Sequence, residues 1–309
     1  MKKLPNIFWQ LTVFLFIAFT FELSACQKLD KAEQDTDTLR ILAIGNSFSD
    51  DGMEHLPALL ENLGIKNIEL ARLFIGGCSL EHHLHCFNTN EADYILYLSK
   101  AGENKWVKTT NVSMQYALDM NEWDIITLQQ VSGLSGVYSS YKPYLESLIE
   151  VIKDIQPSAK IAWHMTWAYS TNSTHPNYWI YGNNQQKMYN AINWCAQQVL
   201  AEYSSIIKII PSGTTIQSLR ESIINNPPKD LTRDGLHLDF GAGRYAAACT
   251  WYESLIEPFT HISIMNNTLR LDIGEINVTD NNAPYILQAA KQAVKKPFEV
   301  HPIEISTTK

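Results

Sequence analysis

The stretch that decides the fold is LRILAIGNSFSDDGMEHLPALLENLG, which runs from Leu39 to Gly64. Its segment RILAIG (40–45) is a short apolar run with the length and composition of a buried strand. Residues 53–64 carry apolar side chains at helical spacing, and Gly64 is a typical helix stop. Ser47 stands between them, at the first position where the chain can turn outward. A serine there is either a helix cap or a nucleophile, and the rest of the sequence has to decide which.

The chain after this stretch repeats the same alternation of segments. Strands are expected at 67–77, 123–130, 159–169 and 206–213, and helices at 141–157, 183–203, 241–259 and 282–297. A loop-rich section separates the second strand from the third. The alternation predicts an α/β fold, a flavodoxin-like three-layer α/β/α sandwich with a central parallel sheet. In such a fold the functional residues gather beyond the carboxyl ends of the strands.

Length and composition fit one globular domain with a substantial core. The chain has 309 residues, of which 45% are hydrophobic and 18% are charged. The formal net charge is -8, and no cluster of Lys and Arg occurs. Because binding to phosphates needs a concentrated basic surface, this balance argues against a nucleic-acid partner.

The N-terminal segment has the character of an export signal. Two lysines precede the apolar run IFWQLTVFLFIAF, and LSAC (23–26) resembles a bacterial lipobox whose Cys26 would be lipidated. We expect a lipoprotein signal peptide at 1–25 and a polar tether at 26–38. This predicts an exported lipoprotein, anchored by its lipid on the periplasmic or cell-surface side of a Gram-negative envelope. A plain secreted protein and a retained membrane anchor are the alternatives.

Residues 39–309 are expected to form one domain, with a core at 39–259 and a C-terminal extension at 260–309. Besides Cys26, the chain holds Cys78, Cys86, Cys195 and Cys249. Four cysteines are too few for a disulfide framework in a domain of this size. One or two bridges could form outside the cytoplasm, and the sequence leaves their pairing open.

Two segments at opposite ends of the domain carry the residue types of acyl-transfer chemistry. Ser47 follows the first strand, and DGLH (234–237) places Asp234 three residues before His237. A serine hydroxyl becomes a nucleophile once a base takes its proton, and an imidazole titrates in the required range. An aspartate at this spacing can fold back onto the same ring and fix its tautomer. The combination predicts a catalytic triad of Ser47, His237 and Asp234.

The two strands next in order end in groups that could stabilise an oxyanion. An oxyanion hole needs inward-pointing donors, such as a backbone amide at a glycine and a side-chain amide. Gly77 and Gln130 can join the amide of Ser47 in this role. Gly76 is indistinguishable from Gly77 by spacing, and Gln129 competes with Gln130 because alternation along a strand sends one of the two to the site.

These blocks together resemble those of the SGNH, or GDSL-type, hydrolases. GNSFS corresponds to the GDS-like nucleophile block, with Asn46 where aspartate is usual, and GGCS supplies the glycine block. LQQVSG departs from the usual GxND block and is similar to the glutamine block of the sialate O-acetylesterase-like branch, which implies Gln130 as oxyanion donor. DGLH matches the last block in full. The likeness covers roughly 39–259 and is greatest to SGNH-like lipoproteins of Gram-negative bacteria that carry GNSFS and GGCSL.

Two further segments offer candidate ligands for a substrate. CSLEHHLHC (78–86) is dense in Cys and His but has no common zinc spacing, so we expect a loop that brings His82 or His83 to the substrate, or a merely solvated loop. AWHMTWAY (162–169) could supply a stacking wall for a sugar through Trp163, His164 and Trp167. Core packing is the default for at least one of the tryptophans, and the stacking wall is the alternative.

The sequence as a whole predicts an ester hydrolase that removes a small acyl group, most simply O-acetyl, from a carbohydrate, without a metal or organic cofactor. The preference for a carbohydrate is implied by the resemblance to the glutamine branch. Two alternatives stay open. One is a lipase or lysophospholipase acting on another ester, and the other is a non-catalytic glycan-binding lipoprotein on the same fold.

Overall fold

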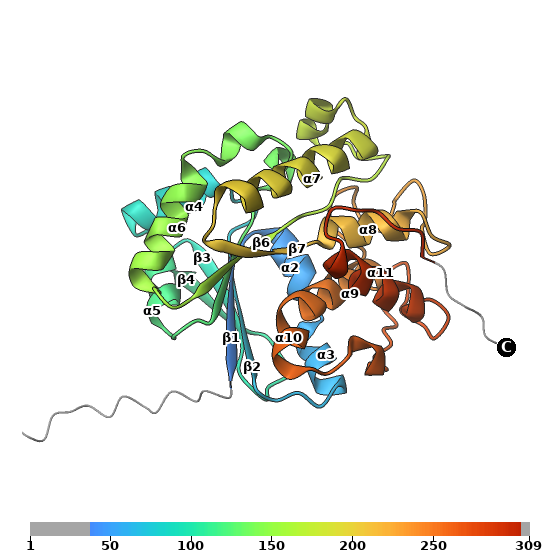
Figure 1. Cartoon of the computed structure of the whole chain (residues 1–309), viewed down its shortest axis with the longest axis horizontal. Helices are drawn as coiled ribbons and strands as arrows, with labels where there is room; N and C mark the ends of the chain where they lie inside the picture. The colour runs from blue at the N-terminus through green and yellow to red at the C-terminus, as the bar shows by residue number, and fades with distance from the viewer. Residues whose placement is uncertain (1–37, 304–309) are drawn as a thin grey trace, which may run out of the picture. The chain divides into compact units, whose positions relative to one another are not determined.

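A seven-stranded sheet forms the centre of the protein (Figure 1), and the computed structural model describes residues 38–303. The expected signal peptide, Cys26 and all but the last residue of the tether lie outside the described residues. The strands are β1 (Leu39–Gly45), β2 (Ile68–Phe74), β3 (Tyr94–Ser99), β4 (Val107–Val112), β5 (Ile125–Leu128), β6 (Lys160–His164) and β7 (Ile206–Ile210). They lie in the order β4-β3-β2-β1-β5-β6-β7.

The sheet is mixed: its central strands are parallel, as expected, and it ends in an antiparallel pair at one edge. Strands β2, β1, β5, β6 and β7 are parallel, as expected, whereas β3 and β4 run antiparallel to their neighbours. Both antiparallel strands lie in the section that reads as loop. Strand β4, VKTTNV, is exposed at its first five residues, so it lacks the apolar run of a central strand.

Helices cover both faces of the sheet, which gives the expected three layers. They are α2 (Ser47–Met53), α3 (Leu56–Asn62), α4 (Leu80–Thr89), α5 (Met114–Asp119), α6 (Tyr144–Ile155), α7 (Gln185–Glu202), α8 (Ser212–Arg220), α9 (Ala242–Trp251), α10 (Glu257–Thr260) and α11 (Ala283–Lys295). Figure 1 shows α4, α5 and α6 on one side of the sheet and α2, α3 and α9 on the other. β1, at the middle of the sheet, is therefore buried at six of its seven residues.

Two predicted helices differ in the structure. The helix expected at 53–64 is α3, which begins only at Leu56 with Pro57 in its first turn, and a separate helix, α2, precedes it from Ser47 to Met53. Proline suits a helix start because it has no amide hydrogen to donate there. The helix expected at 241–259 is α9, followed by a π-helical turn at Tyr252–Ile256 and the short α10.

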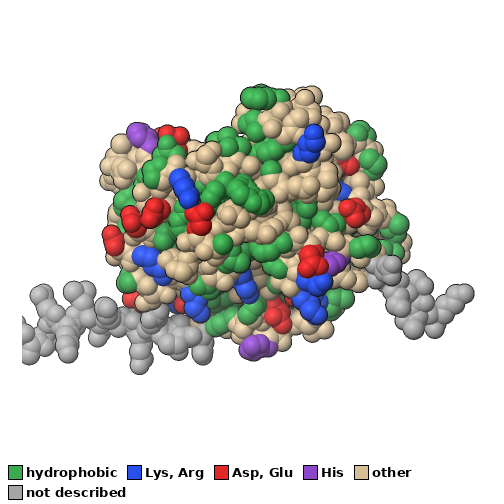
Figure 2. All heavy atoms as spheres, turned by 45° about the horizontal axis from the view of Figure 1, so that its top comes forward, with side chains coloured by type: hydrophobic (Ala, Val, Ile, Leu, Met, Phe, Trp, Pro, Cys, Tyr) green, Lys and Arg blue, Asp and Glu red, His purple; other side chains and the backbone are tan. Residues whose placement is uncertain are grey.

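The C-terminal extension belongs to the same domain. Helix α11 packs against α8 and α9, and its buried side chains include Ile286 and Leu287. The extended stretch before it forms one isolated bridge, between Leu271 and Val278. On the face shown in Figure 2, acidic and basic side chains are interspersed.

Candidate active site

The turn after β1 explains why Gly45, Asn46 and Ser47 follow one another. A Cβ at Gly45 would lie 2.5 Å from Oγ of Ser49, so only glycine fits. Asn46 has extended backbone angles and caps α2, because its Oδ1 accepts a hydrogen bond from the amide of Phe48 at 3.0 Å. Ser47 is the first residue of α2. Since Asn46 is the cap, the hydroxyl of Ser47 is left for another partner.

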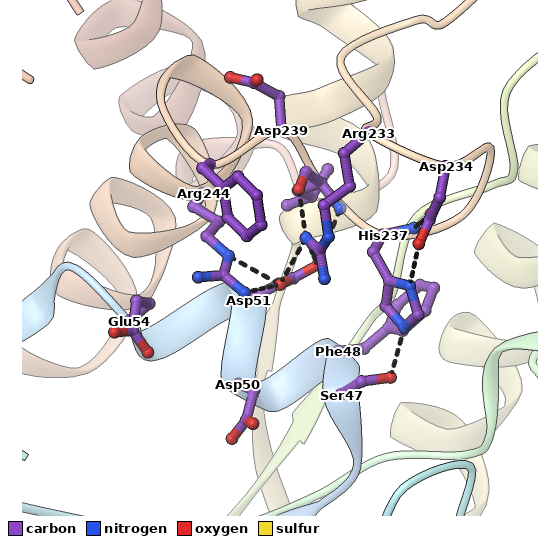
Figure 3. Close-up of polar contacts among 12 residues, drawn as sticks. Ser47, Phe48, Asp50, Asp51, Glu54, Arg233, Asp234, His237, Asp239 and Arg244 are labelled. Atoms are coloured by element: carbon purple, nitrogen blue, oxygen red, sulfur yellow. Dashed lines mark hydrogen bonds and ion pairs between the residues drawn. The ribbon is translucent and has the colours of Figure 1, made fainter. Parts of the chain in front are cut away.

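That partner is His237, and the predicted triad residues come together. Nε2 of His237 lies 2.9 Å from Oγ of Ser47, although the two residues are 190 positions apart. Nδ1 of the same ring lies 2.7 Å from Oδ2 of Asp234. Figure 3 shows the three side chains in a line, with the ring between the hydroxyl and the carboxylate. This is the geometry in which a histidine can take the serine proton while an aspartate orients the ring.

The carboxylate of Asp234 is held as an anion by its neighbours. Its Oδ1 accepts hydrogen bonds from the amides of Leu236 at 3.1 Å and His237 at 2.8 Å. Partial burial works to raise the pKa of Asp234, but the hydrogen bonds from the ring and both amides outweigh it and lower that pKa below its usual value. An ionised Asp234 favours an N–H on Nδ1 of His237, which leaves Nε2 free to accept the proton of Ser47.

A buried ionic cluster joins the helix of the serine to the loop of the histidine. Asp51 is 0% exposed, and its Oδ1 lies 2.8 Å from Nε of Arg244 and 3.1 Å from Nη1 of Arg233. Its Oδ2 accepts from the amide of Leu238 at 2.8 Å. Figure 3 shows both guanidinium groups converging on this carboxylate. Because Asp51 belongs to α2, as Ser47 does, and Leu238 follows His237, the cluster holds Ser47 in position relative to His237 and Asp234.

Trp167 and Ser170 hold the loop of His237 in position. Nε1 of Trp167 donates to the carbonyl of Leu236 at 2.8 Å, and its ring stacks on Phe48 with centroids 4.2 Å apart. The amide of Ser170 donates to the carbonyl of Gly235, which has a φ of +92°. This conformation favours glycine, so Gly235 suits the D-x-x-H turn for a backbone reason.

Trp163, His164 and Trp167 are not a sugar-stacking wall, which corrects the expectation for this segment. All three are at most 2% exposed. The ring of Trp163 packs on Tyr141, and His164 bonds to Gln129 and Ser212. A bound sugar cannot stack on side chains that the core encloses.

The expectation of a loop carrying His82 and His83 is also corrected, because both lie in α4. His83 is 0% exposed, and its Nδ1 lies 2.9 Å from the hydroxyl of Tyr94. Burial lowers the pKa of His83 to about 3, so this ring is a neutral core residue. His82 is exposed and stacks against His85.

The glycine turn after β2 lies beside the nucleophile turn. The amide of Cys78 donates to the carbonyl of Ile75, which places Gly77 at the third position of a turn with a φ of +64°. A turn of this kind favours glycine there. Gly76 and Gly77 are both exposed, and the carbonyl of Cys78 accepts from Nδ2 of Asn46 at 2.9 Å. The turn that contains Gly77 is therefore hydrogen-bonded, through the carbonyl of Cys78, to the residue that precedes Ser47.

The two glutamines after β5 point to different places. Gln130 donates through Nε2 to the carbonyl and hydroxyl of Ser140, and its Oε1 accepts from the amides of Leu80 and Val131. Its side chain thus braces the start of α4 and does not present its amide to Ser47, which corrects the choice of Gln130 as oxyanion donor. Nε2 of Gln129 instead donates to Oδ1 of Asn46 at 2.7 Å. Gln129 is therefore the glutamine at the nucleophile turn.

Sequence reasoning missed the cluster around Asp51. Its signals are present in retrospect: Asp51 stands four residues after Ser47, and Arg233 directly precedes Asp234. Within residues 38–303, no group of three or more His, Cys, Asp or Glu side chains is arranged to hold a metal ion. The four cysteines of the domain are buried and unpaired, which answers the open question of their bridges. None of the helices described is long and apolar enough to cross a membrane.

Comparison with known proteins places the chain in a family. Residues 40–293 match the model of a domain of unknown function, DUF4886. A DUF4886 family protein from Bacteroides uniformis is 36% identical, with a TM-score of 0.76 over 86% of this chain and 98% of its own. None of the curated proteins matches the sequence.

Two solved structures are similar to the chain at lower identity. A protein from Slackia heliotrinireducens, described as a candidate SGNH hydrolase, is 21% identical with a TM-score of 0.49, covering 70% of this chain and 98% of its own. An acetylxylan esterase from Geobacillus stearothermophilus is 13% identical with a TM-score of 0.45, covering 71% and 94%. At identities this low, similarity to these two proteins does not assign a chemistry to the chain. The family is settled by the match over residues 40–293 and by the Bacteroides uniformis relative: the chain belongs to the DUF4886 family.

Proposed function

We propose that the protein is a serine esterase of the SGNH type that removes a small acyl group, O-acetyl in the simplest case, from a carbohydrate. The observation that carries the proposal is the line of hydrogen bonds from Ser47 through His237 to Asp234, at 2.9 and 2.7 Å. Three residues of these types in this order are the working parts of acyl transfer. The assignment of the SGNH type rests on the GNSFS, GGCS and DGLH blocks and on the positions of the triad after β1 and before α9.

The chemistry proceeds in two halves. Oγ of Ser47 attacks the ester carbonyl while Nε2 of His237 takes its proton, and the imidazolium is stabilised by Asp234. The amides of Ser47 and Gly77 are the candidate donors to the tetrahedral oxyanion. The intermediate collapses to an acyl-enzyme, and His237 gives its proton to the leaving alkoxide. Water then attacks the acyl-enzyme with His237 as base, which releases the carboxylic acid and restores Ser47. These steps need no metal or organic cofactor.

A polar cavity lined by residues that follow β2 and β5 supports a hydroxylated substrate. It has a volume of about 270 Å³ and lies between the starts of α4 and α6, beyond the carboxyl ends of β2 and β5. Its polar lining consists of Ser79, Glu81, Gln130, Ser139, Ser140, Lys142 and Tyr144. Its Ser79 is two residues along the chain from Gly77, a candidate oxyanion donor. Hydroxyl, carboxylate and ammonium groups of this kind recognise sugar hydroxyls, whereas a long acyl chain needs an apolar groove.

The test of this function is a substrate series with the wild-type domain and Ser47→Ala. We expect turnover of p-nitrophenyl acetate and acetylated sugars that declines as the acyl chain lengthens and is absent in Ser47→Ala. Rising activity on long-chain esters would favour a lipase or lysophospholipase. Glycan binding without turnover of any ester would favour the non-catalytic alternative.

We also propose that the protein is an exported lipoprotein, on the sequence LSAC at 23–26 and the apolar run before it. Cys26 would carry the lipid, and the polar segment after it would be the tether to an envelope membrane. Cys26→Ser should move the protein from the membrane fraction to the soluble fraction in a cell fractionation. A Cys26→Ser variant that still sediments with membranes and keeps residues 1–25 contradicts lipidation and supports a retained anchor.

A further inference from the structure

A line of buried side chains runs beneath the nucleophile turn and crosses the carboxyl ends of the five parallel strands. Oγ of Ser212, after β7, lies 3.0 Å from Nε2 of His164, at the end of β6. Nδ1 of His164 lies 2.8 Å from Oε1 of Gln129, after β5, and Nε2 of Gln129 donates to Asn46, after β1, at 2.7 Å. Asn46 donates to the carbonyl of Cys78, after β2, at 2.9 Å. The four side chains are at most 1% exposed.

The carbonyl of Cys78, at one end of this line, fixes the direction of every hydrogen bond in it. The carbonyl of Cys78 can only accept, so Nδ2 of Asn46 faces it and Oδ1 of Asn46 is left to accept. Gln129 must then donate to Asn46 and turn its own carbonyl to His164. His164 consequently carries its proton on Nδ1 and accepts at Nε2 from the hydroxyl of Ser212. Burial lowers the pKa of His164 to about 3, so the ring stays neutral near pH 7 and holds this single tautomer.

Asn46 connects the two backbone groups that the proposed chemistry uses as oxyanion donors. Ser47, whose amide is one donor, directly follows Asn46. Gly77, whose amide is the other, directly precedes Cys78, the residue that Asn46 holds by its carbonyl. An aspartate in place of Asn46 could still cap α2 through Phe48. It would, however, set a carboxylate oxygen against the carbonyl of Cys78, where the asparagine places an N–H.

We propose that the line Ser212–His164–Gln129–Asn46–Cys78 is a positioning device that sets the distance between the amides of Ser47 and Gly77. The inference rests on the proposed function, because an oxyanion hole matters only if Ser47 is acylated. Asn46, Gln129 and His164 touch no reacting atom in this scheme and act through the backbone of the two turns. The line accounts for the asparagine at 46, for the glutamine at 129 and for a histidine buried at 164.

Asn46→Asp is the decisive substitution, and Asn193→Asp is its matched control. Nδ2 of Asn193 also donates to a backbone carbonyl at 2.9 Å, that of Phe298, and Asn193 is also buried. Both substitutions therefore replace a buried NH2 group that donates to a backbone carbonyl by an oxygen, and Asn193 also loses its hydrogen bond to the hydroxyl of Tyr189. We expect Asn46→Asp to lower kcat for p-nitrophenyl acetate by about tenfold or more with KM within about twofold, because the oxyanion exists only in the transition state. Asn193→Asp should lower the thermal midpoint and leave kcat unchanged.

Three results would overturn part of this reasoning, each in a different place. Equal kcat in Asn46→Asp and wild type, with Ser47-dependent turnover in both, overturns the positioning role alone. Absence of Ser47-dependent turnover in the wild type overturns the proposed function, and the catalytic role of the line with it. Nitrogen-15 NMR of the histidine rings should show His164 with its proton on Nδ1, and an Nε2–H tautomer would overturn the line itself.

Discussion

Asp51→Asn tests whether the buried ionic cluster holds the two halves of the triad together. In the wild type, one fully buried carboxylate accepts from Arg244, Arg233 and the amide of Leu238 at distances between 2.8 and 3.2 Å. Asparagine keeps the shape but loses the charge, and its NH2 group must face a guanidinium or an amide donor. Breaking a buried ion pair by removing one partner costs about 3–5 kcal/mol. We expect the free energy of unfolding to fall by that amount.

The same substitution should slow catalysis in the molecules that remain folded. With the tie to Leu238 weakened, the loop of Asp234 and His237 can shift relative to Ser47. A misplacement of about 1 Å in a catalytic group can cost about a hundredfold in rate, so we expect kcat to fall by about 10- to 100-fold. Urea unfolding gives the stability, and turnover of p-nitrophenyl acetate is then measured where the variant is fully folded.

Asp124→Asn is the control, because Asp124 also accepts from a backbone amide, that of Arg40 at 2.7 Å, but at the opposite end of β1. It should lose stability and keep its kcat. The reasoning about Asp51 is refuted if Asp51→Asn unfolds within about 1 kcal/mol of the wild type and turns over within about twofold of it. A large loss of stability with full turnover would make the cluster a matter of folding alone.

Three further outcomes are expected. Ser47→Ala should abolish covalent labelling by a fluorophosphonate and change the free energy of unfolding by about 1 kcal/mol or less, because Asn46 rather than Ser47 caps α2; labelling that persists would place the nucleophile elsewhere. Gln130→Ala should lower the free energy of unfolding by about 1–3 kcal/mol and leave kcat within a few-fold, since its amide is bonded to Ser140; a hundredfold loss of kcat would restore Gln130 as an oxyanion donor. Burial raises the pKa of Asp50 to about 6, so folding favours its protonated form, and this contribution is fully present below about pH 4 and lost as the pH rises through 6. The difference in free energy of unfolding between Asp50→Asn and the wild type should therefore shift in favour of the variant by about 2–3 kcal/mol as the pH rises from 4 to 8, measured by urea titrations. A difference that does not change with pH would contradict the raised pKa of Asp50.

The elements that the sequence predicts well are those whose local signals agree with their surroundings. β1 is apolar apart from Arg40 and lies at the middle of the sheet, and the D-x-x-H block folds back on itself within four residues. Both were therefore readable from short segments. β4 is an exposed edge strand with no apolar run, so no local signal marks it. Without a recognisable partner strand, β3 also falls in the section that the sequence predicts as loop.

The parts of the site that could not be predicted depend on contacts across the whole chain. Asp51 and Arg233 are 182 residues apart. Each is a charged residue of a type that is mostly solvent-exposed, so neither suggests burial by itself. The choice between Gln129 and Gln130 is of another kind. Alternation requires that one of them face the nucleophile turn, but which one depends on where β5 ends, and only the structure places that end at Leu128.

The outer edge of β4 bears on how copies of the protein behave when many are crowded together. Such an edge offers unpaired backbone groups to any neighbouring strand, and long flat edges seed fibres. Here the ladder between β3 and β4 is irregular at Tyr94 and Ile95, Asn111 has a φ of +58°, and Lys108 lies on the strand. A kinked, charged edge is a poor template for a second copy. Copies of the protein at high local concentration would thus meet without pairing their edge strands into a continuous sheet.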